Sequence, residues 1–380
     1  MIRVGVLFWF LYLPTLTLTV GQVPFPEIRI YISATQFANL KNQHDTKTNL
    51  THAVMLINGD SAQLGELHDR GNNSLKFQRK SLSVELDHEM KLNNPELRLK
   101  KFNLVSLSMD KNFWHNRWAN LVLQQQELFP LYNTYCTVWI NDVAQGIYLL
   151  IEKPTHFRNV IKSPYMLRRG LNHVIQDEYV DAEMKNSVKR YRQQYNAMYA
   201  TLKLRDESQI APQLARYLNL PRYYRWMAFN YYVMNGDYSD EVYLWIDPVS
   251  GLFNVLPWDF DDILKPAPHE GWAARNQTLA DRKVFSMEET FDRAVATHPQ
   301  LYSDYETILK QVVSELDSAH LWQASKQVLA ELQALTTHST VAQASQFLDR
   351  QPLDFNAVQH DITQSMELLL KRRRWILTGK

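Results

Sequence analysis

Hydrophobic and polar residues follow two different patterns along the chain, and the first half shows short alternating or continuous apolar runs. Runs of this kind, bounded by turn residues, are typical of β-strands. They predict strands over residues 28–32, 53–57, 77–86, 104–109, 137–141 and 147–151. A helix is expected among them, over residues 112–126. The first half is therefore predicted to be rich in strands.

From about Ala182 the apolar residues recur with the 3.6-residue period of amphipathic helices. This period predicts helices over residues 183–204, 209–218, 221–234, 287–296, 300–316, 320–335 and 355–377. An irregular stretch, residues 235–285, separates the third of these helices from the fourth. A strand-rich part followed by a helix-rich part predicts an α+β fold.

The first residues resemble an export signal. A positive charge precedes an apolar run that ends near Gly21, so residues 1–21 are predicted to be a cleaved signal peptide. A membrane anchor is the alternative, but the run is below about 20 residues and is interrupted by Gly5 and Pro14. The expected location is exported, whether periplasmic, cell-surface or extracellular, with no stable membrane span after cleavage.

Composition excludes several classes of function. Lys and Arg number 41 against 40 Asp and Glu, so the net charge of +1 offers no basic field for nucleic acid. Glycine is 11 of 380 residues, about half the usual share of roughly 7%, which argues against a glycine-rich nucleotide loop. Cys136 is the single cysteine, which excludes an internal disulfide and a cysteine-based zinc site.

The most informative segment is an acidic hairpin, residues 235–262. Two apolar strands, residues 242–247 and 252–256, flank a Pro/Gly turn, so the chain returns to where it started. Acids before the first strand are therefore expected to lie beside acids after the second. These six carboxylates are Asp237, Asp240, Glu241, Asp259, Asp261 and Asp262.

Carboxylate oxygens select Mg²⁺, Mn²⁺ or Ca²⁺ over zinc. Because Mg²⁺ uses few carboxylates and completes its shell with water and phosphate oxygens, such a cluster points to phosphoryl transfer. A solvated acidic loop is the alternative. The apolar neighbours Pro257, Trp258 and Phe260 favour a partly buried site instead.

Lys80 is expected on the apolar face of the predicted strand 77–86, with Leu82, Val84 and Leu86. A buried ammonium group requires a carboxylate or a bound anion, and a phosphate would serve. The alternative is that Lys80 extends its amine to water at the start of the strand.

Several short motifs, in this order and spacing, resemble the CotH kinase family of atypical protein kinases, over roughly residues 25–375. The motifs are Arg70-Gly71-Asn72-Asn73-Ser74, Arg79-Lys80-Ser81-Leu82, Gly146-Ile147-Tyr148-Leu149-Leu150-Ile151-Glu152, Asn235-Gly236-Asp237, Tyr243-Leu244-Trp245 and Pro257-Trp258-Asp259-Phe260-Asp261.

The resemblance implies a two-lobed, protein-kinase-like fold, with a strand-rich N-lobe over residues 22–157 and a helical C-lobe over residues 158–380. It implies that Lys80 holds ATP phosphates, and that Glu152 and Lys153 form the hinge that reads adenine. The helix after Asp110, with His115, Asn116 and Arg117, would take the place of the kinase helix whose polar side chain anchors the lysine.

For catalysis, the resemblance makes Asp237 the catalytic aspartate and Asp259 a ligand of Mg²⁺ or Mn²⁺, with Asp261 as a further metal contact. Glu241 stands where the family usually has a metal-binding Asn, so this chain departs from the pattern there.

Three functions are compatible with these features. The first is an ATP- and Mg²⁺-dependent kinase that phosphorylates Ser or Thr of exported or surface proteins. The second is a catalytically silent, kinase-like surface binding protein. The third is a metal-dependent hydrolase of phosphate or polysaccharide, in which Lys80 would have no role.

Overall fold

The computed structural model describes residues 25–43, 46–71, 73–92, 98–180, 182–337 and 353–379. The predicted signal peptide, residues 1–21, lies outside the described residues. Within the described ranges, none of the helices combines the length and the apolar character that crossing a bilayer requires.

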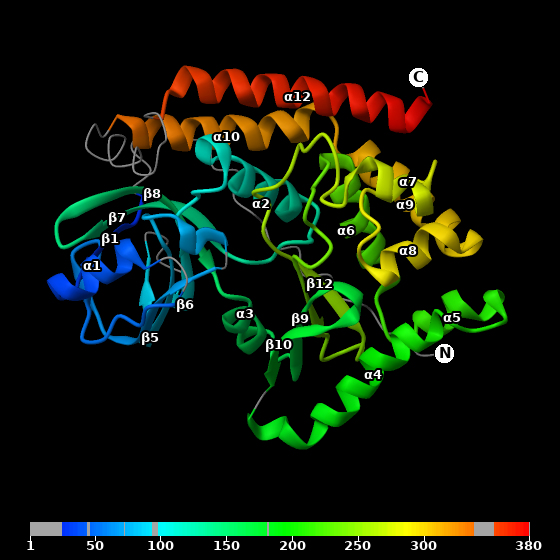
Figure 1. Cartoon of the computed structure of the whole chain (residues 1–380), viewed down its shortest axis with the longest axis horizontal. Helices are drawn as coiled ribbons and strands as arrows, with labels where there is room; N and C mark the ends of the chain where they lie inside the picture. Colours follow the sequence, from blue (N-terminus) through cyan, green and yellow to red (C-terminus); the bar gives the residue numbers. More distant parts are fainter. Residues whose placement is uncertain are drawn as a thin grey trace, which may run out of the picture.

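Strands of the first half form one mixed sheet, which lies at the left in Figure 1. Among the described residues it has eight strands in the order β3-β2-β1-β7-β8-β6-β5-β4. β1 pairs with β7 in parallel, and the other neighbours are antiparallel. The strands are β1 (Glu27–Tyr31), β2 (Val54–Ile57), β3 (Asp60–Ala62), β4 (Leu64–Arg70), β5 (Ser81–Lys91), β6 (Arg98–Val105), β7 (Asn133–Ile140) and β8 (Val143–Glu152).

Each of the six predicted runs corresponds to a strand of this sheet, but some of the predicted borders were wrong. β5 begins at Ser81, so residues 77–80 lie in the turn before it. β6 ends at Val105, and Leu107 takes a positive φ of 56° that an extended strand does not allow. The short β3, the strand β4 and the helix α1 (Ala34–Asn42) were not predicted. The capping box of Ser33 and Gln36 at the start of α1 was a usable signal.

A second sheet lies near the middle of the molecule and holds the predicted hairpin (Figure 1). Its described strands follow the order β10-β9-β11-β12, all antiparallel. They are β9 (Tyr165–Arg169), β10 (Ile175–Val180), β11 (Val242–Ile246) and β12 (Phe253–Pro257). β9 and β10 were not predicted, so the hairpin gains a neighbouring strand along one edge.

Helices form the rest of the molecule. They are α2 (His115–Gln125), α3 (Pro154–Val160), α4 (Val188–Thr201), α5 (Ile210–Leu214), α6 (Leu220–Val233), α7 (Gly271–Leu279), α8 (Thr290–Thr297), α9 (Pro299–Glu315), α10 (Ser318–Thr336) and α12 (Phe355–Thr378). The sequence patterns missed α3 and α7. The mixed composition of sheets and helices confirms the predicted α+β class.

Two hydrophobic cores organise these elements. The smaller core lies on the first sheet and includes Ile30, Val84 and Val138. The larger core joins α2 and part of the first sheet to the second sheet and the C-terminal helices. α2 packs against α10, where Arg117 forms an ion pair of 2.7 Å with Glu331. α2 therefore fixes the first sheet relative to the helical part, and α10 and α12 lie side by side above them (Figure 1).

Candidate active site

The β11–β12 hairpin brings its flanking acids together, as the sequence predicted. Val242 pairs with Pro257, and the Trp258 N–H donates to the Glu241 carbonyl over 3.1 Å. Just beyond, Asp259 adopts a φ of 46°, in the left-handed region that Asp tolerates better than most residues. The acid-bearing segments before and after the hairpin therefore meet at one end of it.

Three carboxylates gather in the loop that precedes β11. Asp237, Asp240 and Glu241 each offer an oxygen within 4.8 Å of the others, which is close enough to share one cation. Burial, the dominant cause, raises the pKa of Asp237 to about 6, although His269 lowers it. Burial and the neighbouring Asp259 raise the pKa of Glu241 well above its ordinary value. The cluster accumulates negative charge that a divalent cation would relieve.

The segment after β12 is fastened by the start of α2. The buried Asp110 carboxylate accepts from the backbone N–H groups of His115 (2.9 Å) and Asn116 (2.8 Å), which positions this helix start. The Asn116 side-chain oxygen then accepts from the Phe260 N–H over 2.8 Å, and His115 Nδ1 lies 3.4 Å from the Asp261 carbonyl. These residues of α2 thus hold the Asp259–Asp261 segment, in place of the lysine contact that the family resemblance implied.

Asp261 is a second strongly perturbed acid in this segment. Burial, then the charges of Asp259 and Asp110, raise the pKa of Asp261 well above its ordinary value. A partly buried carboxyl group near two other acids is in an environment that a cation would stabilise.

His269 joins two acids of the site, and the sequence analysis had not singled it out. Its Nδ1 lies 3.1 Å from Asp237 Oδ1, and its Nε2 lies 2.8 Å from Asp262 Oδ2. Lys265 pairs with the other oxygen of Asp262 at 2.6 Å. A Cβ at Gly236 would lie 2.4 Å from Asp262 Oδ2, so only glycine fits beside this arrangement.

Two arginines of β9 hold the acidic loop from the opposite side. Arg168 pairs with Glu241 at 2.6 Å. Arg169 is fully buried and donates to the Ser239 carbonyl over 2.7 Å and to the Tyr223 hydroxyl over 2.6 Å. Because β9 was not predicted, the approach of these arginines to the site was not predicted either. The adjacent pair of charges at the end of an apolar run was the one usable signal.

The structure does not bring Lys80 to these carboxylates. Lys80 precedes β5, is 2% exposed, and donates from Nζ to the carbonyls of Gln43 (2.7 Å) and Leu75. Burial lowers the pKa of Lys80, and the acid that opposes this is Asp69 of β4. The predicted burial is confirmed and the alternative of a water-exposed amine is wrong, but the partners of Lys80 are main-chain oxygens of the first part of the chain.

Arg70, at the end of β4, is the cation that the first sheet presents to the acidic hairpin. Its guanidinium lies 5.8 Å from the ring centroid of Trp258, the residue directly before Asp259. Among the described residues, no carboxylate lies within ion-pair distance of Arg70. Arg70 begins one of the motifs of the family resemblance, but no role was predicted for its side chain.

Glu152 and Lys153 lie where the chain leaves the first sheet. The Glu152 carboxylate accepts from the Tyr132 N–H (3.1 Å) and contacts His156 Nδ1 (2.6 Å), so its side chain is occupied within the protein. The Lys153 N–H donates to the Lys101 carbonyl, and burial lowers the pKa of Lys153 to about 8. The two residues thus occupy the connection to α3 and β9, where the predicted hinge would lie.

Comparison with known proteins agrees with this arrangement of motifs. The chain matches the family described as CotH kinase protein over residues 67–323, which is more than half of its length and includes Arg70, Lys80 and the whole acidic hairpin. No curated protein matches the chain. The resemblance inferred from the short motifs is confirmed, and the chain belongs to the CotH kinase family.

Proposed function

We propose that this protein is an ATP- and divalent-metal-dependent kinase that phosphorylates Ser or Thr of exported or surface proteins. The observation that carries the proposal is the cluster of Asp237, Asp240 and Glu241, whose oxygens lie within 4.8 Å of one another, in a member of the CotH kinase family. The register of the β11–β12 hairpin returns the segment of Asp259 and Asp261 to the same end. The export component rests on the predicted signal peptide.

The donor set fits a hard cation. All of the candidate ligands are carboxylates, and burial and mutual repulsion raise the pKa values of Glu241 and Asp261. In this proposal Asp259, Glu241 and Asp261 hold Mg²⁺ or Mn²⁺, which when bound would neutralise phosphate charge. Glu241 carries one more negative charge than the usual Asn, and its ion pair with Arg168 offsets that charge.

Asp237 suits the catalytic role because its side chain is 43% exposed and can face a substrate hydroxyl. It would orient that hydroxyl and accept its proton as the bond to phosphorus forms. The eight-stranded sheet would act as the N-lobe and the helical part as the C-lobe, with Glu152 and Lys153 between them.

The proposed kinase also requires a cation that contacts the nucleotide phosphates. Lys80 was predicted for this role, yet its Nζ is engaged by two backbone carbonyls. Arg70 lies beside Trp258 and has no acidic partner among the described residues. We therefore propose Arg70 as a second candidate for contacting the nucleotide phosphates.

One observation favours the alternative of a catalytically silent binding protein. The contacts of Lys80 with the carbonyls of Gln43 and Leu75 keep its charge within the first part of the chain. A protein that no longer transfers phosphate would tolerate such an arrangement. Phosphoryl transfer would instead require another cation in contact with the nucleotide phosphates.

Transfer of labelled phosphate from ATP, with Mg²⁺ or Mn²⁺, to the protein itself or to a mixture of exported proteins tests the proposal. We expect Asp237→Asn to lower the rate by at least about a hundredfold, because a positioned base typically contributes that much. Asp259→Asn should abolish both transfer and the stabilisation of the protein by ATP with metal. Stabilisation without transfer would instead support the silent scaffold, and neither effect in the unaltered protein would reject the kinase.

A further inference from the structure

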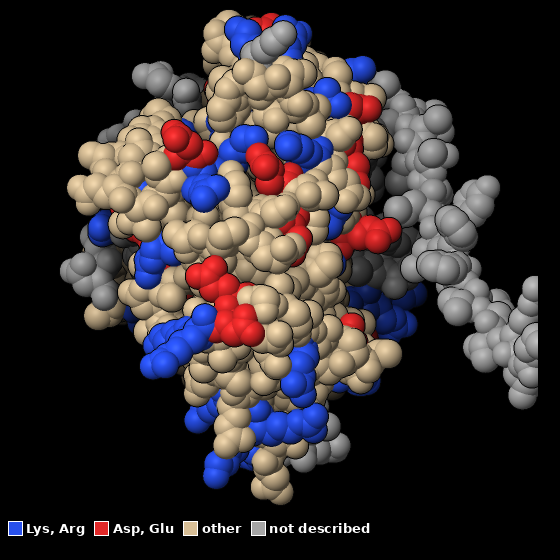
Figure 2. Space-filling view, turned by 90° about the vertical axis from the view of Figure 1, so that its right-hand side faces the viewer, with Lys and Arg blue, Asp and Glu red and all other residues tan. Residues whose placement is uncertain are grey.

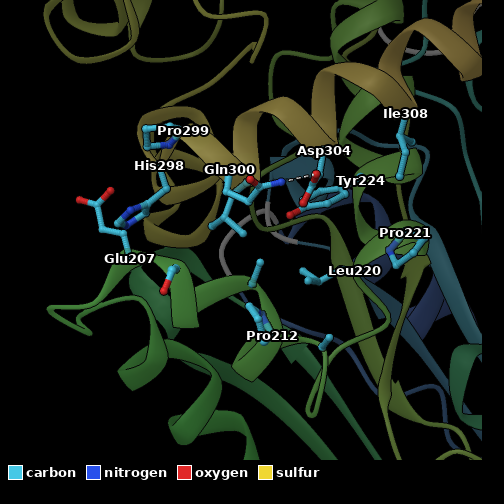
Figure 3. Close-up of a pocket in the computed structure, with 14 residues that line it drawn as sticks. Glu207, Pro212, Leu220, Pro221, Tyr224, His298, Pro299, Gln300, Asp304 and Ile308 are labelled. Carbon is cyan, nitrogen blue, oxygen red and sulfur yellow. Dashed lines mark hydrogen bonds between the residues drawn. The ribbon is translucent and has the colours of Figure 1, made fainter.

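A cavity of about 770 Å³ lies away from the acidic hairpin, between helix ends of the C-terminal half. Its walls are the short 3₁₀ turn Glu207–Gln209 with α5, the first turn of α6 and the first turns of α9. Figure 3 shows Pro212 and Leu220 below it, with Gln300, Asp304 and Tyr224 above. The size is in the range of sites that hold several side chains or a small ligand.

The lining combines an apolar surface with acidic groups. Ala211, Pro212 and Leu220 contribute apolar surface, whereas Glu207 and Asp304 contribute carboxylates. None of the described lining residues is Lys or Arg, and among the described residues no such cation pairs with either acid. On the side of the molecule where α5 and α9 lie, Figure 2 shows both signs of charge interspersed. The fixed charges of the lining are therefore negative, with His298 as its titratable base, whereas that face as a whole carries both signs.

A buried hydroxyl points to an absent partner. Tyr224 is 2% exposed, lines the cavity, and its hydroxyl has no hydrogen-bond partner among the described residues. Burial and the Asp304 charge raise the pKa of Tyr224, so the phenol stays protonated and remains a donor. Gln300 donates to Asp304 Oδ1 over 2.8 Å, which fixes this carboxylate at the cavity (Figure 3). An unsatisfied buried hydroxyl is costly unless a partner is gained.

We infer that this cavity is a docking site for a peptide segment of a protein partner that inserts an apolar side chain and places Lys or Arg against Asp304 and Glu207. Charge complementarity selects the basic residue, and the surface of Ala211, Pro212 and Leu220 selects the apolar one. That the partner is also the phosphate acceptor rests on the proposed function.

The helix α6 sets the distance between the docking site and the acidic loop. Pro221 and Tyr224 line the cavity at the start of α6, and Asp237 follows shortly after its end at Val233. At 1.5 Å per residue, α6 runs roughly 18 Å from Pro221 to Val233, and Asp237 lies just beyond that end. An extended peptide covers this distance in about six residues. The docking residues and the phosphorylated Ser or Thr should therefore be at least that far apart in sequence.

Fluorescence anisotropy without nucleotide tests docking by itself. The probes are short labelled peptides with Leu, Pro or Phe flanked by Arg, together with versions in which Glu replaces Arg. We expect the basic peptides to bind the full chain, and Ala211→Trp or Asp304→Lys to weaken binding by about tenfold or more. Glu367→Lys, which makes the same charge change at an exposed position of α12 outside the lining, should leave binding unchanged.

Several outcomes would overturn the docking site. These are absence of binding by every basic peptide, equal binding of the acidic versions, and binding that survives both cavity substitutions. Self-association of the protein that is lost in the same variants would assign the cavity to a second copy of the chain.

A second measurement separates docking from catalysis. Peptides that carry the docking residues at increasing distance from one Ser are tested for phosphorylation, and we expect transfer to improve once the spacer exceeds about six residues. Docking without any transfer would support the cavity as a binding site and count against the proposed kinase activity. Transfer that ignores both the docking residues and the spacer would overturn the docking site alone.

Discussion

His269 shows how single side chains define the candidate site. Its ring bridges Asp237 and Asp262, and Asp262 is in turn held by Lys265. A carboxylate fixed in this way presents one orientation to a substrate instead of several. Because Asp237 is the proposed catalytic group, His269 is a candidate positioning residue that acts through it.

We expect His269→Ala to lower kcat by about tenfold while KM for ATP stays unchanged, because the imidazole contacts Asp237 and Asp262 and none of the residues proposed to bind ATP. His269→Gln, which keeps a hydrogen-bond donor, should restore part of the rate. His320→Ala is the matched control, since His320 has the same 46% side-chain exposure and contacts its own acid, Asp317. Steady-state phosphorylation kinetics measure both constants, and a His320 variant as impaired as the His269 variant would refute the role.

Single substitutions can also decide whether Arg70 or Lys80 contacts the nucleotide phosphates. If Arg70 contacts phosphate, Arg70→Ala should raise KM for ATP by about tenfold, since charge-assisted hydrogen bonds to phosphate are among the strongest. Lys80→Met should chiefly lower stability, because the Gln43 and Leu75 carbonyls lose their donor. Nucleotide titration and thermal unfolding of both variants distinguish the two. The opposite pattern would return the phosphate role to Lys80.

At the scale of elements, the unpredicted strand β9 decides how the acidic loop is held. The strand, Tyr165–Arg169, ends in two adjacent arginines. Arg168 pairs with the Glu241 carboxylate, and Arg169 donates to the Ser239 carbonyl. The Arg169 Nη2 atom also lies 3.9 Å from Asp292 Oδ2. Burial nevertheless outweighs this attraction and raises the pKa of Asp292 to about 6. β9 thus combines strand pairing with support of the loop that carries Asp237.

Arg169→Met should destabilise the protein by about 3–5 kcal/mol, because the buried Asp292 and the Ser239 carbonyl lose their cation. Arg192→Met is the control. Arg192 also pairs with an acid, Glu178, but its side chain is 57% exposed, so the loss should stay below about 1 kcal/mol. Denaturant unfolding gives both free energies. Equal losses would show that Arg169 supports the loop no better than a surface ion pair.

At the scale of the whole molecule, several partly or fully buried acids make stability depend on pH and on metal. Burial is the largest cause in each case, raising the pKa of Asp237 and Asp292 to about 6 and that of Glu288 to about 7. These groups bind protons more readily in the folded than in the unfolded protein. The folded state is therefore favoured as pH falls through these values towards the ordinary carboxyl range near 4.

We accordingly expect the unfolding temperature of the metal-free protein to rise by a few degrees between pH 7.5 and pH 5.5. Lys153 does not oppose this rise in stability, because its pKa is lowered to about 8 and its deprotonation therefore changes the free energy of unfolding mainly above this pH interval. Added Mg²⁺ should stabilise the protein more at pH 7.5 than at pH 5.5, where protons compete for the same oxygens. Scanning calorimetry, with sodium chloride at matched ionic strength as the control, measures both. Stability that falls over this pH interval would contradict the interpretation.

The hairpin could be predicted because its signals are local. Alternating apolar residues around the turn at Pro248–Gly251 determine two strands of equal length, and their register then brings Asp237 and Asp259 to the same end. The position of Lys80 could not be predicted in this way. Alternation from Phe77 to Leu86 looks continuous in the sequence, but pairing with β4 begins only at Ser81, opposite Arg70. The side chain of Lys80 therefore follows the turn and not the face of the strand.

The sequence by itself determined the α+β class, the acidic hairpin and the family resemblance, because periodicity, turn residues and motif spacing are written in neighbouring positions. Only the tertiary structure decided which distant groups meet. It placed His269 between Asp237 and Asp262, Arg168 beside Glu241 and the Asn116 side-chain oxygen against the Phe260 N–H, and it formed the open cavity beside Tyr224. These contacts depend on how whole elements pack around the core, and no local pattern of residues encodes that packing.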